Sequence, residues 1–216
     1  MNRSIEDYIK NIYTIKQAVG KVTTSLLAEN LKVSPAAVSE MISKLSKSGY
    51  IKNTPYKGFE LTKKGEKIAL NLIRKHRLWE FFLVKYLDFP WDKVHDEAEK
   101  LEHVSTDELI SKLESYMDFP KHDPHGYPIP DQNGKMEKDN CIPLTEAAIG
   151  STGTIKRVSD ESSEFLSYLS KVGLKLNEDV KVTDRIDFDN SIEISKKTGK
   201  LFLSEKLAGN IYIQAK

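Results

Sequence analysis

The segment EAEKLEH, residues 97–103, gathers carboxylates and an imidazole at helical spacing. On a helix, Glu99, Glu102 and His103 share one face, where the two like charges repel each other. Carboxylates together with histidine are the donors that divalent transition metals select. The spacing therefore predicts a metal site on this face, and the repulsion predicts that the face is unfavourable until a dication arrives.

All histidines of the chain fall in its middle. Their positions span 50 residues and are His76, His95, His103, His122 and His125. His76 and Glu80 stand at i and i+4 of one predicted helix, and His95 precedes Glu99 by the same interval on the next. A single histidine is more often structural than a ligand, but two neighbouring helices with such pairs indicate two nearby metal sites.

Two long helices must position these side chains. Hydrophobic periodicity predicts them over residues 63–87 and 92–117, separated by DFPW. The first carries a surplus of large apolar residues, which are Leu70, Ile73, Trp79, Phe82, Leu83 and Tyr86. Such a surplus predicts a homodimer interface, with an intramolecular core as the alternative. Residues 119–144 hold five of the eight prolines and predict an irregular linker.

The N-terminal third has the pattern of a winged helix. A first helix is predicted over residues 4–17, followed by a helix-turn-helix in TTSLLAENL and PAAVSEMISKLSK. Ser34 would cap the second helix of that pair, and Pro35 suits its first position. Short β-runs near residues 50–52 and 59–62 enclose a Pro/Gly turn. A helical hairpin without a ligand is the plain alternative.

The second helix of this pair is predicted to read DNA. Its exposed face is short and polar, as a major groove requires, and lysines follow where phosphates would lie. The residues expected to face the groove are Ser34, Ala36, Ala37, Ser39 and Glu40, and those expected to face phosphates are Lys44, Lys47 and Lys57. Lys32 stands at the turn, where such motifs often have glycine.

The C-terminal third is rich in short β-runs. They are GTIKRVSD, DVKVTDRID, SIEISKK, LFLSEK and NIYIQAK, with a short helix, SEFLSYLSKVGL, between the first two. This series predicts a small SH3-like barrel. The expected fold class is mainly α with β, in three domains. Residues 1–72 would form a winged helix-turn-helix, 73–140 a helical dimerisation and metal-binding domain with the linker, and 141–216 the barrel.

Charge is segregated along a chain of net charge +1. Residues 1–77 carry 15 Lys and Arg against 6 Asp and Glu, residues 78–140 carry 7 against 15, and the remainder 11 against 11. The basic first third predicts an anionic partner, most often nucleic acid, and the acidic middle predicts a cationic one. Solvated surface charge is the alternative for both.

Other features of the chain indicate where it acts. The richest apolar run, LWEFFLVKYLDF, is interrupted by charges and is too short to span a membrane. The N-terminus lacks the pattern of a signal peptide. The lone Cys141 agrees with a reducing compartment. We therefore expect a cytoplasmic protein with no membrane partner.

The strings RKHRLWE, VHDEAEKLEHVS, HDPHGYPIP and EDYIKNIY resemble the diphtheria-toxin-repressor family of metal-dependent transcriptional regulators. The resemblance covers nearly the whole chain and implies a FeoA-like C-terminal domain. It also implies a DNA-binding repressor and not an enzyme. In that family a divalent metal is the corepressor, and the loaded dimer binds double-stranded operator DNA upstream of metal-uptake genes.

The resemblance further implies the ligands. The primary site falls on Asp7, Glu99, Glu102 and His103, and the second site on His76, Glu80, His95, Asp123, His125 and Asp160. Iron-type members typically have Met and Cys where this chain has Asp7 and Glu99. The oxygen donors therefore imply the manganese-type branch, because Mn²⁺ prefers carboxylates. Two-metal manganese regulators carry an acidic residue where this chain has Lys10, which favours two separated sites.

The predicted function is thus a repressor with Mn(II) as corepressor, control over metal-uptake genes and no small-molecule substrate. A dication that joins Asp7 to the other helix would fix the spacing of the two recognition helices in the dimer. An Fe(II)-responsive repressor of the same family is the first alternative, and other divalent transition metals would bind in vitro. Two further alternatives are a winged-helix regulator of a small organic ligand and a metal-dependent hydrolase, for which no nucleophile or base is evident.

Overall fold

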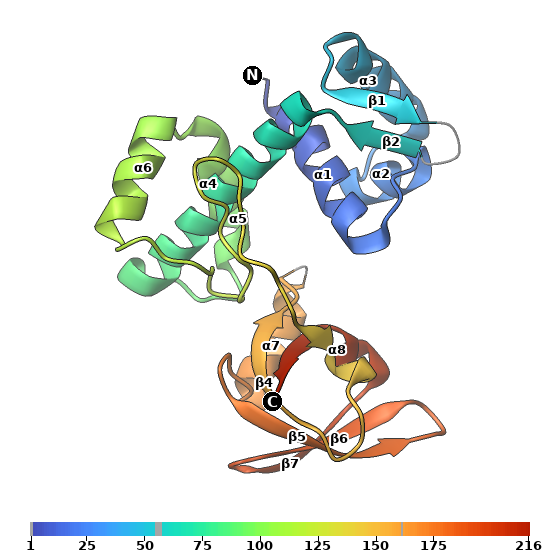
Figure 1. Ribbon diagram of the computed structural model, residues 1–216, viewed down its shortest axis with the longest axis vertical. Helices are drawn as coiled ribbons and strands as arrows, with labels where there is room; N and C mark the ends of the chain where they lie inside the picture. Colours follow the sequence, from blue (N-terminus) through green and yellow to red (C-terminus); the bar gives the residue numbers. More distant parts are fainter. Residues whose placement is uncertain (1, 55–57, 161) are drawn as a thin grey trace. The chain divides into compact units, whose positions relative to one another are not determined.

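Helices form most of the N-terminal half and an antiparallel sheet forms the C-terminal part, as the sequence predicted (Figure 1). The computed structural model describes residues 2–54, 58–160 and 162–216. The chain divides into two compact units. The N-terminal unit holds residues 1–76, 99–111 and 130–136, and the C-terminal unit holds residues 77–98, 112–129 and 137–216. The three domains expected from the sequence stay a prediction.

The winged helix-turn-helix lies in the N-terminal unit. Its elements are α1 (Arg3–Val19), α2 (Thr24–Leu31), α3 (Pro35–Lys47), β1 (Ile51–Thr54) and β2 (Gly58–Leu61). Side-chain oxygens of Asn2, Thr23 and Ser34 cap the three helices by accepting backbone N–H groups. Lys32 takes a left-handed φ of 54° between α2 and α3, a conformation that favours glycine.

One apolar core joins these helices. Ile9 and Ile12 of α1 are buried with Leu27 of α2 and with Val38 and Leu45 of α3. Burial of side chains of this size contributes about 1.5–3 kcal/mol each. As a result, α1 and the predicted recognition helix α3 belong to one packed body.

The middle of the chain holds three helices rather than two. The predicted helix over residues 63–87 is α4 (Lys63–Leu87). The single helix predicted over residues 92–117 is wrong, because α5 (Val94–Val104) ends before α6 (Asp107–Tyr116) begins. Thr106 causes the break: its Oγ1 accepts the backbone N–H of Leu109 at 3.2 Å, which makes it an N-cap. The acidic first turn of α6 also favours a helix start at this point.

The C-terminal unit contains a six-stranded antiparallel sheet in the order β3-β8-β4-β5-β6-β7. Its strands are β3 (Ile142–Pro143), β4 (Thr152–Val158), β5 (Asp179–Ile186), β6 (Ser191–Lys196), β7 (Gly199–Leu203) and β8 (Ile211–Ala215). A 3₁₀ turn, η1 (Leu144–Glu146), and two helices, α7 (Ser163–Lys171) and α8 (Glu205–Gly209), accompany them. Register shifts in β4 and β5 mark the bulges that let such a sheet curve. The five predicted strands and α7 are present, whereas β3 and α8 are too short for a readable sequence pattern.

Among the helices in the described part of the chain, none combines the length and the apolar character needed to cross a membrane.

Candidate metal centre

The primary cluster lies in the N-terminal unit, where α1 faces α5. Asp7, Glu99 and His103 each direct a donor atom to it. His103 Nε2 lies 2.9 Å from Asp7 Oδ1 and 3.5 Å from Glu102 Oε1. Despite the short separation, neither His103 Nε2 nor Asp7 Oδ1 has a hydrogen-bond partner among the described residues. Two buried polar atoms without a partner, in a set of carboxylates and imidazole, fit a divalent cation.

Glu6 orients the ring of His103. Its Oε2 lies 2.7 Å from His103 Nδ1. An ionised carboxylate can only accept a hydrogen bond, so Nδ1 carries the proton and Nε2 presents its lone pair toward Asp7. Partners of this kind fix histidine ligands in metal sites. Sequence reasoning missed Glu6, because no sequence pattern relates it to a residue 97 positions later.

Lys10 of α1 brings a positive charge to the glutamates of α5. Its Nζ donates to both oxygens of Glu102, at 2.9 and 2.8 Å, and to Glu99 Oε2 at 2.7 Å. Glu102 is fully buried and is also hydrogen-bonded to His76 Nδ1. Burial would lower the pKa of Lys10, but Glu102 and Glu99 outweigh it and the pKa is raised. Burial also raises the pKa of Asp7, and His103 opposes that rise only in part.

A second cluster lies in the C-terminal unit and consists of Glu80, Asp123 and His125, all of them buried. His125 Nε2 donates to the carbonyl oxygen of Trp91 at 2.8 Å, so that Nδ1 is the ring nitrogen that faces the cluster, 3.7 Å from Glu80 Oε2. Asp123 Oδ1 accepts the backbone N–H groups of His125 and Tyr127. Within residues 2–54, 58–160 and 162–216, Asp123 Oδ2 and His125 Nδ1 have no hydrogen-bond partner. The donor set again fits a divalent cation.

The pKa values of this cluster follow from its burial and its charges. Burial raises the pKa of Asp123 to about 7, and the negative charge of Glu80 adds to the effect. Burial would lower the pKa of His125, but Glu80 and Asp123 raise it to about 9. The cluster therefore holds protons readily, and a bound metal ion would have to displace them.

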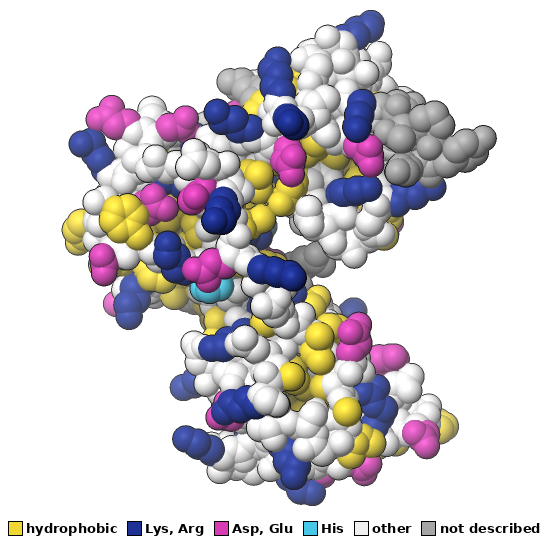
Figure 2. Space-filling view, viewed as in Figure 1, with side chains coloured by type: hydrophobic (Ala, Val, Ile, Leu, Met, Phe, Trp, Pro, Cys, Tyr) yellow, Lys and Arg dark blue, Asp and Glu magenta, His cyan; other side chains and the backbone are white. Residues whose placement is uncertain are grey.

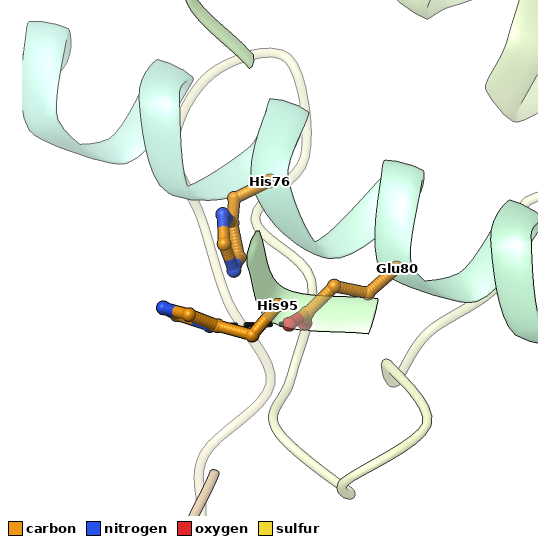
Figure 3. A group of neighbouring side chains, drawn as sticks. All are labelled: His76, Glu80 and His95. Atoms are coloured by element: carbon orange, nitrogen blue, oxygen red, sulfur yellow. Dashed lines mark ion pairs between the residues drawn. The ribbon is translucent and has the colours of Figure 1, made fainter. Parts of the chain in front are cut away.

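The other residues predicted for the second site do not all lie among the buried donors of this cluster. His95 Nδ1 lies 3.5 Å from Glu80 Oε1, and the His95 side chain is 47% exposed. Figure 3 shows His76 and Glu80 one turn apart on the same side of α4, with the ion pair between Glu80 and His95 dashed. Asp160 is outside the donor clusters found among the described residues. Its negative charge still contributes to the raised pKa of Asp123.

The turn that carries Asp123 and His125 is held on β4. Val158 N–H donates to the carbonyl oxygen of His125 at 2.9 Å. Gly126 has φ +93°, and a Cβ at this position would lie 1.9 Å from the carbonyl oxygen of Lys156. The irregular linker was predicted over residues 119–144. Residues 119–141 contain no helix or strand, but β3 and η1 begin inside the predicted range. The turn at His125 and Gly126 lies against β4.

Gly126→Ala should lower the free energy of unfolding by about 2–4 kcal/mol, because a left-handed backbone and a backbone clash act together. Gly150→Ala is the matched control, since Gly150 has φ +86° with open space around it. That variant should cost about 1 kcal/mol, from the backbone conformation alone. Urea unfolding measures both values. Equal losses of unfolding free energy in the two variants would show that the backbone of β4 can shift to accommodate the added methyl group.

The DNA-facing residues expected from the sequence lie on or beside α3. Ser34, Ala36, Ala37, Ser39, Glu40, Lys44 and Lys47 are all exposed. Lys57 lies outside the described residues. Ser34 Oγ accepts the N–H of Ala37, and Ser39 Oγ donates to the carbonyl oxygen of Pro35. Figure 2 shows Lys and Arg side chains spread over the visible face of the winged helix-turn-helix. Contact of these residues with DNA stays a prediction.

Three protein-family models match the chain in succession. The N-terminal DNA-binding domain of iron dependent repressors matches residues 1–59. The metal binding and dimerisation domain of the same repressors matches residues 62–131. The FeoA domain matches residues 142–215.

Individual proteins match as well. An uncharacterized HTH-type transcriptional regulator of Methanocaldococcus jannaschii is 39% identical over 119 residues, which are 55% of this chain and 95% of that protein. The diphtheria toxin repressor of Corynebacterium diphtheriae is 27% identical over 97% of this chain and 96% of that protein. A solved structure of a manganese-dependent transcriptional repressor with manganese is 35% identical, with a TM-score of 0.92 over 98% of this chain and 100% of that chain.

Proposed function

Because this chain belongs to the family of iron- and manganese-dependent transcriptional repressors, we propose that it represses metal-uptake genes as a homodimer with Mn(II) as corepressor. Metal sensing and DNA binding by a dimeric repressor follow from family membership. The choice of manganese, the operator target and the individual ligands are our proposals. A cytoplasmic location and the absence of a small-molecule substrate remain expectations.

The observation that carries the proposal is the meeting of Asp7 with His103. Asp7 Oδ1 and His103 Nε2 are buried 2.9 Å apart without a hydrogen-bond partner among the described residues. We assign Asp7, Glu99, Glu102 and His103 as the residues that would hold the regulatory metal. Three carboxylates and one imidazole, without sulfur, favour Mn(II). Fe(II) is the alternative, because iron dependent repressors match the chain and similar donors serve both ions.

The chain's own residues explain why metal would alter DNA binding. Asp7 belongs to α1, whose buried face shares one core with α2 and α3. Glu99, Glu102 and His103 belong to α5. Lys10 already offsets the repulsion between Glu99 and Glu102. A bound dication would supply the further positive charge that favours the approach of Asp7 to them. Asp7 would then hold α1, and with it the recognition helix, at a fixed distance from α5.

We place the dimer interface on an aromatic row of the C-terminal unit. The ring centroids of Trp79 and Phe82 are 5.9 Å apart, those of Phe82 and Tyr86 are 5.5 Å apart, and those of Tyr86 and Tyr116 are 5.5 Å apart. Tyr116 is 69% exposed and Tyr86 is 42% exposed. Exposed aromatic residues of this kind are enriched at subunit interfaces.

Equilibrium dialysis against Mn²⁺ tests the proposed site. The unmodified chain should bind Mn²⁺ in stoichiometric amounts, and Asp7→Ala should bind one ion fewer per chain. Absence of stoichiometric metal would instead support a regulator of an organic ligand.

Glu6→Ala should weaken Mn²⁺ binding about 10–100-fold, the usual effect of removing the partner that orients a histidine ligand. Glu6→Gln is the matched control, because its amide oxygen can still accept the Nδ1 proton of His103. Competition with a chromophoric chelator measures both affinities. An affinity in Glu6→Ala equal to that of the unmodified chain would show that the His103 ring needs no partner.

A further inference from the structure

Lys10 is a largely buried cation inside the cluster assigned to metal. Its side chain is 14% exposed. Three carboxylate oxygens lie within 2.7–2.9 Å of Nζ, and His76 Nδ1 lies 3.3 Å from it. A lysine in such a place stays charged only where carboxylates surround it, as they do here.

The primary cluster contains two donor sets that share Glu99. One set is Asp7, Glu99 and His103, and the other is His76, Glu99 and Glu102. Lys10 Nζ contacts every member of the second set. No hydrogen bond or ion pair joins Nζ to Asp7 or His103 in the described part of the chain. The ammonium therefore occupies the second set, and a metal ion on the first set would share Glu99 and Glu102 with it.

We propose that the Lys10 ammonium is the resident cation of the set His76, Glu99 and Glu102, where it takes the place of a second metal ion. This inference rests on the proposed function, because it assumes that a metal ion binds the set with Asp7. A dication on the second set would need the donor atoms that surround Nζ. The two like charges cannot share that position, so the primary cluster takes one metal ion.

The same contacts link two helices before any metal binds. Lys10 lies on α1, whereas Glu99 and Glu102 lie on α5. In the metal-free chain the ammonium therefore holds α1 near α5. Metal binding would add a link through Asp7 to this existing contact. Because Lys10 already restrains α1 beside α5, the metal would have to restrict the motion of α1 less.

The test counts Mn²⁺ ions per full-length chain at saturating Mn²⁺ by equilibrium dialysis. Lys10→Leu removes the ammonium, and Lys10→Glu replaces it with a carboxylate. Both variants should bind one ion more than the unmodified chain. The added ion should give an exchange-coupled Mn²⁺ pair in the electron paramagnetic resonance spectrum, because Glu99 belongs to both donor sets. Lys16→Leu is the control on the same helix. Lys16 lies outside the cluster and pairs with Glu60 at 3.5 Å, so this variant should bind as many Mn²⁺ ions as the unmodified chain.

A folded Lys10→Leu chain that binds the same number of ions as the unmodified chain would overturn the proposal. If Lys10→Glu does not fold, the ion count of Lys10→Leu alone decides the test. Asp7→Ala separates the two levels of the argument. If Asp7→Ala removes one ion but the Lys10 variants gain none, only the role of Lys10 fails. If Asp7→Ala removes no ion, the proposed primary site fails. Amide hydrogen exchange of α1 in the metal-free chain should be faster in Lys10→Leu, and an unchanged rate would contradict the link between the helices.

Discussion

Asp7→Asn should remove nearly all of the Mn²⁺-dependent gain in DNA affinity and leave the metal-free chain folded. Coupling between an effector and a ligand in regulated proteins is typically about 5–150-fold, and that is the size of the expected loss. Asp7 is the only proposed ligand on α1, so the variant has no ligand left to join α1 to α5 through metal. The new amide can donate to His103 Nε2, which lies 2.9 Å from Asp7 Oδ1, and this hydrogen bond keeps the fold intact.

Fluorescence anisotropy measures this effect on a labelled DNA duplex selected from a random pool by the Mn²⁺-loaded chain. Asp187→Asn, an exposed change in the C-terminal unit, serves as the control for the loss of one carboxylate. The control should keep the full response. A response of normal size in Asp7→Asn would show that α1 contributes no ligand.

Glu102→Ala should have the largest effect on the stability of the metal-free chain. The carboxylate is fully buried and receives two hydrogen bonds from Lys10. Removal of one partner from a buried ion pair leaves an uncompensated charge and costs 3–5 kcal/mol in typical cases. We expect about 3 kcal/mol, the lower end of that range, because Glu99 still pairs with the ammonium. The variant should also lose Mn²⁺ binding at the primary cluster.

Urea unfolding in the presence of a chelator tests the stability effect. Asp96→Ala is the control, since Asp96 is an exposed carboxylate on the same helix. The double variant Glu102→Ala with Lys10→Leu should recover part of the lost stability, because no ammonium is then left to bury. If Glu102→Ala unfolds within about 0.5 kcal/mol of the unmodified chain, as an ordinary surface substitution does, the pair with Lys10 is energetically unimportant.

Sequence periodicity was sufficient for most of the fold because it reports which faces of helices and strands are buried. The winged helix-turn-helix, α4 and the five long strands of the sheet could be predicted in this way. The break between α5 and α6 could not, because the apolar spacing continues through it. A local hydrogen bond from Leu109 to Thr106 decides that break, and Thr106 is also compatible with a helix interior.

Only some residues of the candidate site could be predicted from the sequence. Glu99, Glu102 and His103 could be grouped from spacing alone, because they lie on one helix. Their meeting with Asp7 was implied only by the family resemblance. Glu6 was beyond either approach, and the resemblance marked Lys10 only as a departure from the two-metal pattern. The contacts of both residues depend on the packing of α1 beside α5, across 89 to 97 residues.

The central claim is that a dication at the primary cluster raises DNA affinity. Its most direct test is the Kd of the unmodified chain for the selected duplex across buffered free Mn²⁺ concentrations, with Fe²⁺ and Zn²⁺ in parallel. Affinity should rise at least about fivefold as Mn²⁺ saturates the site and should fall back when a chelator removes it. The same Kd in the metal-loaded and metal-free chain would contradict the claim.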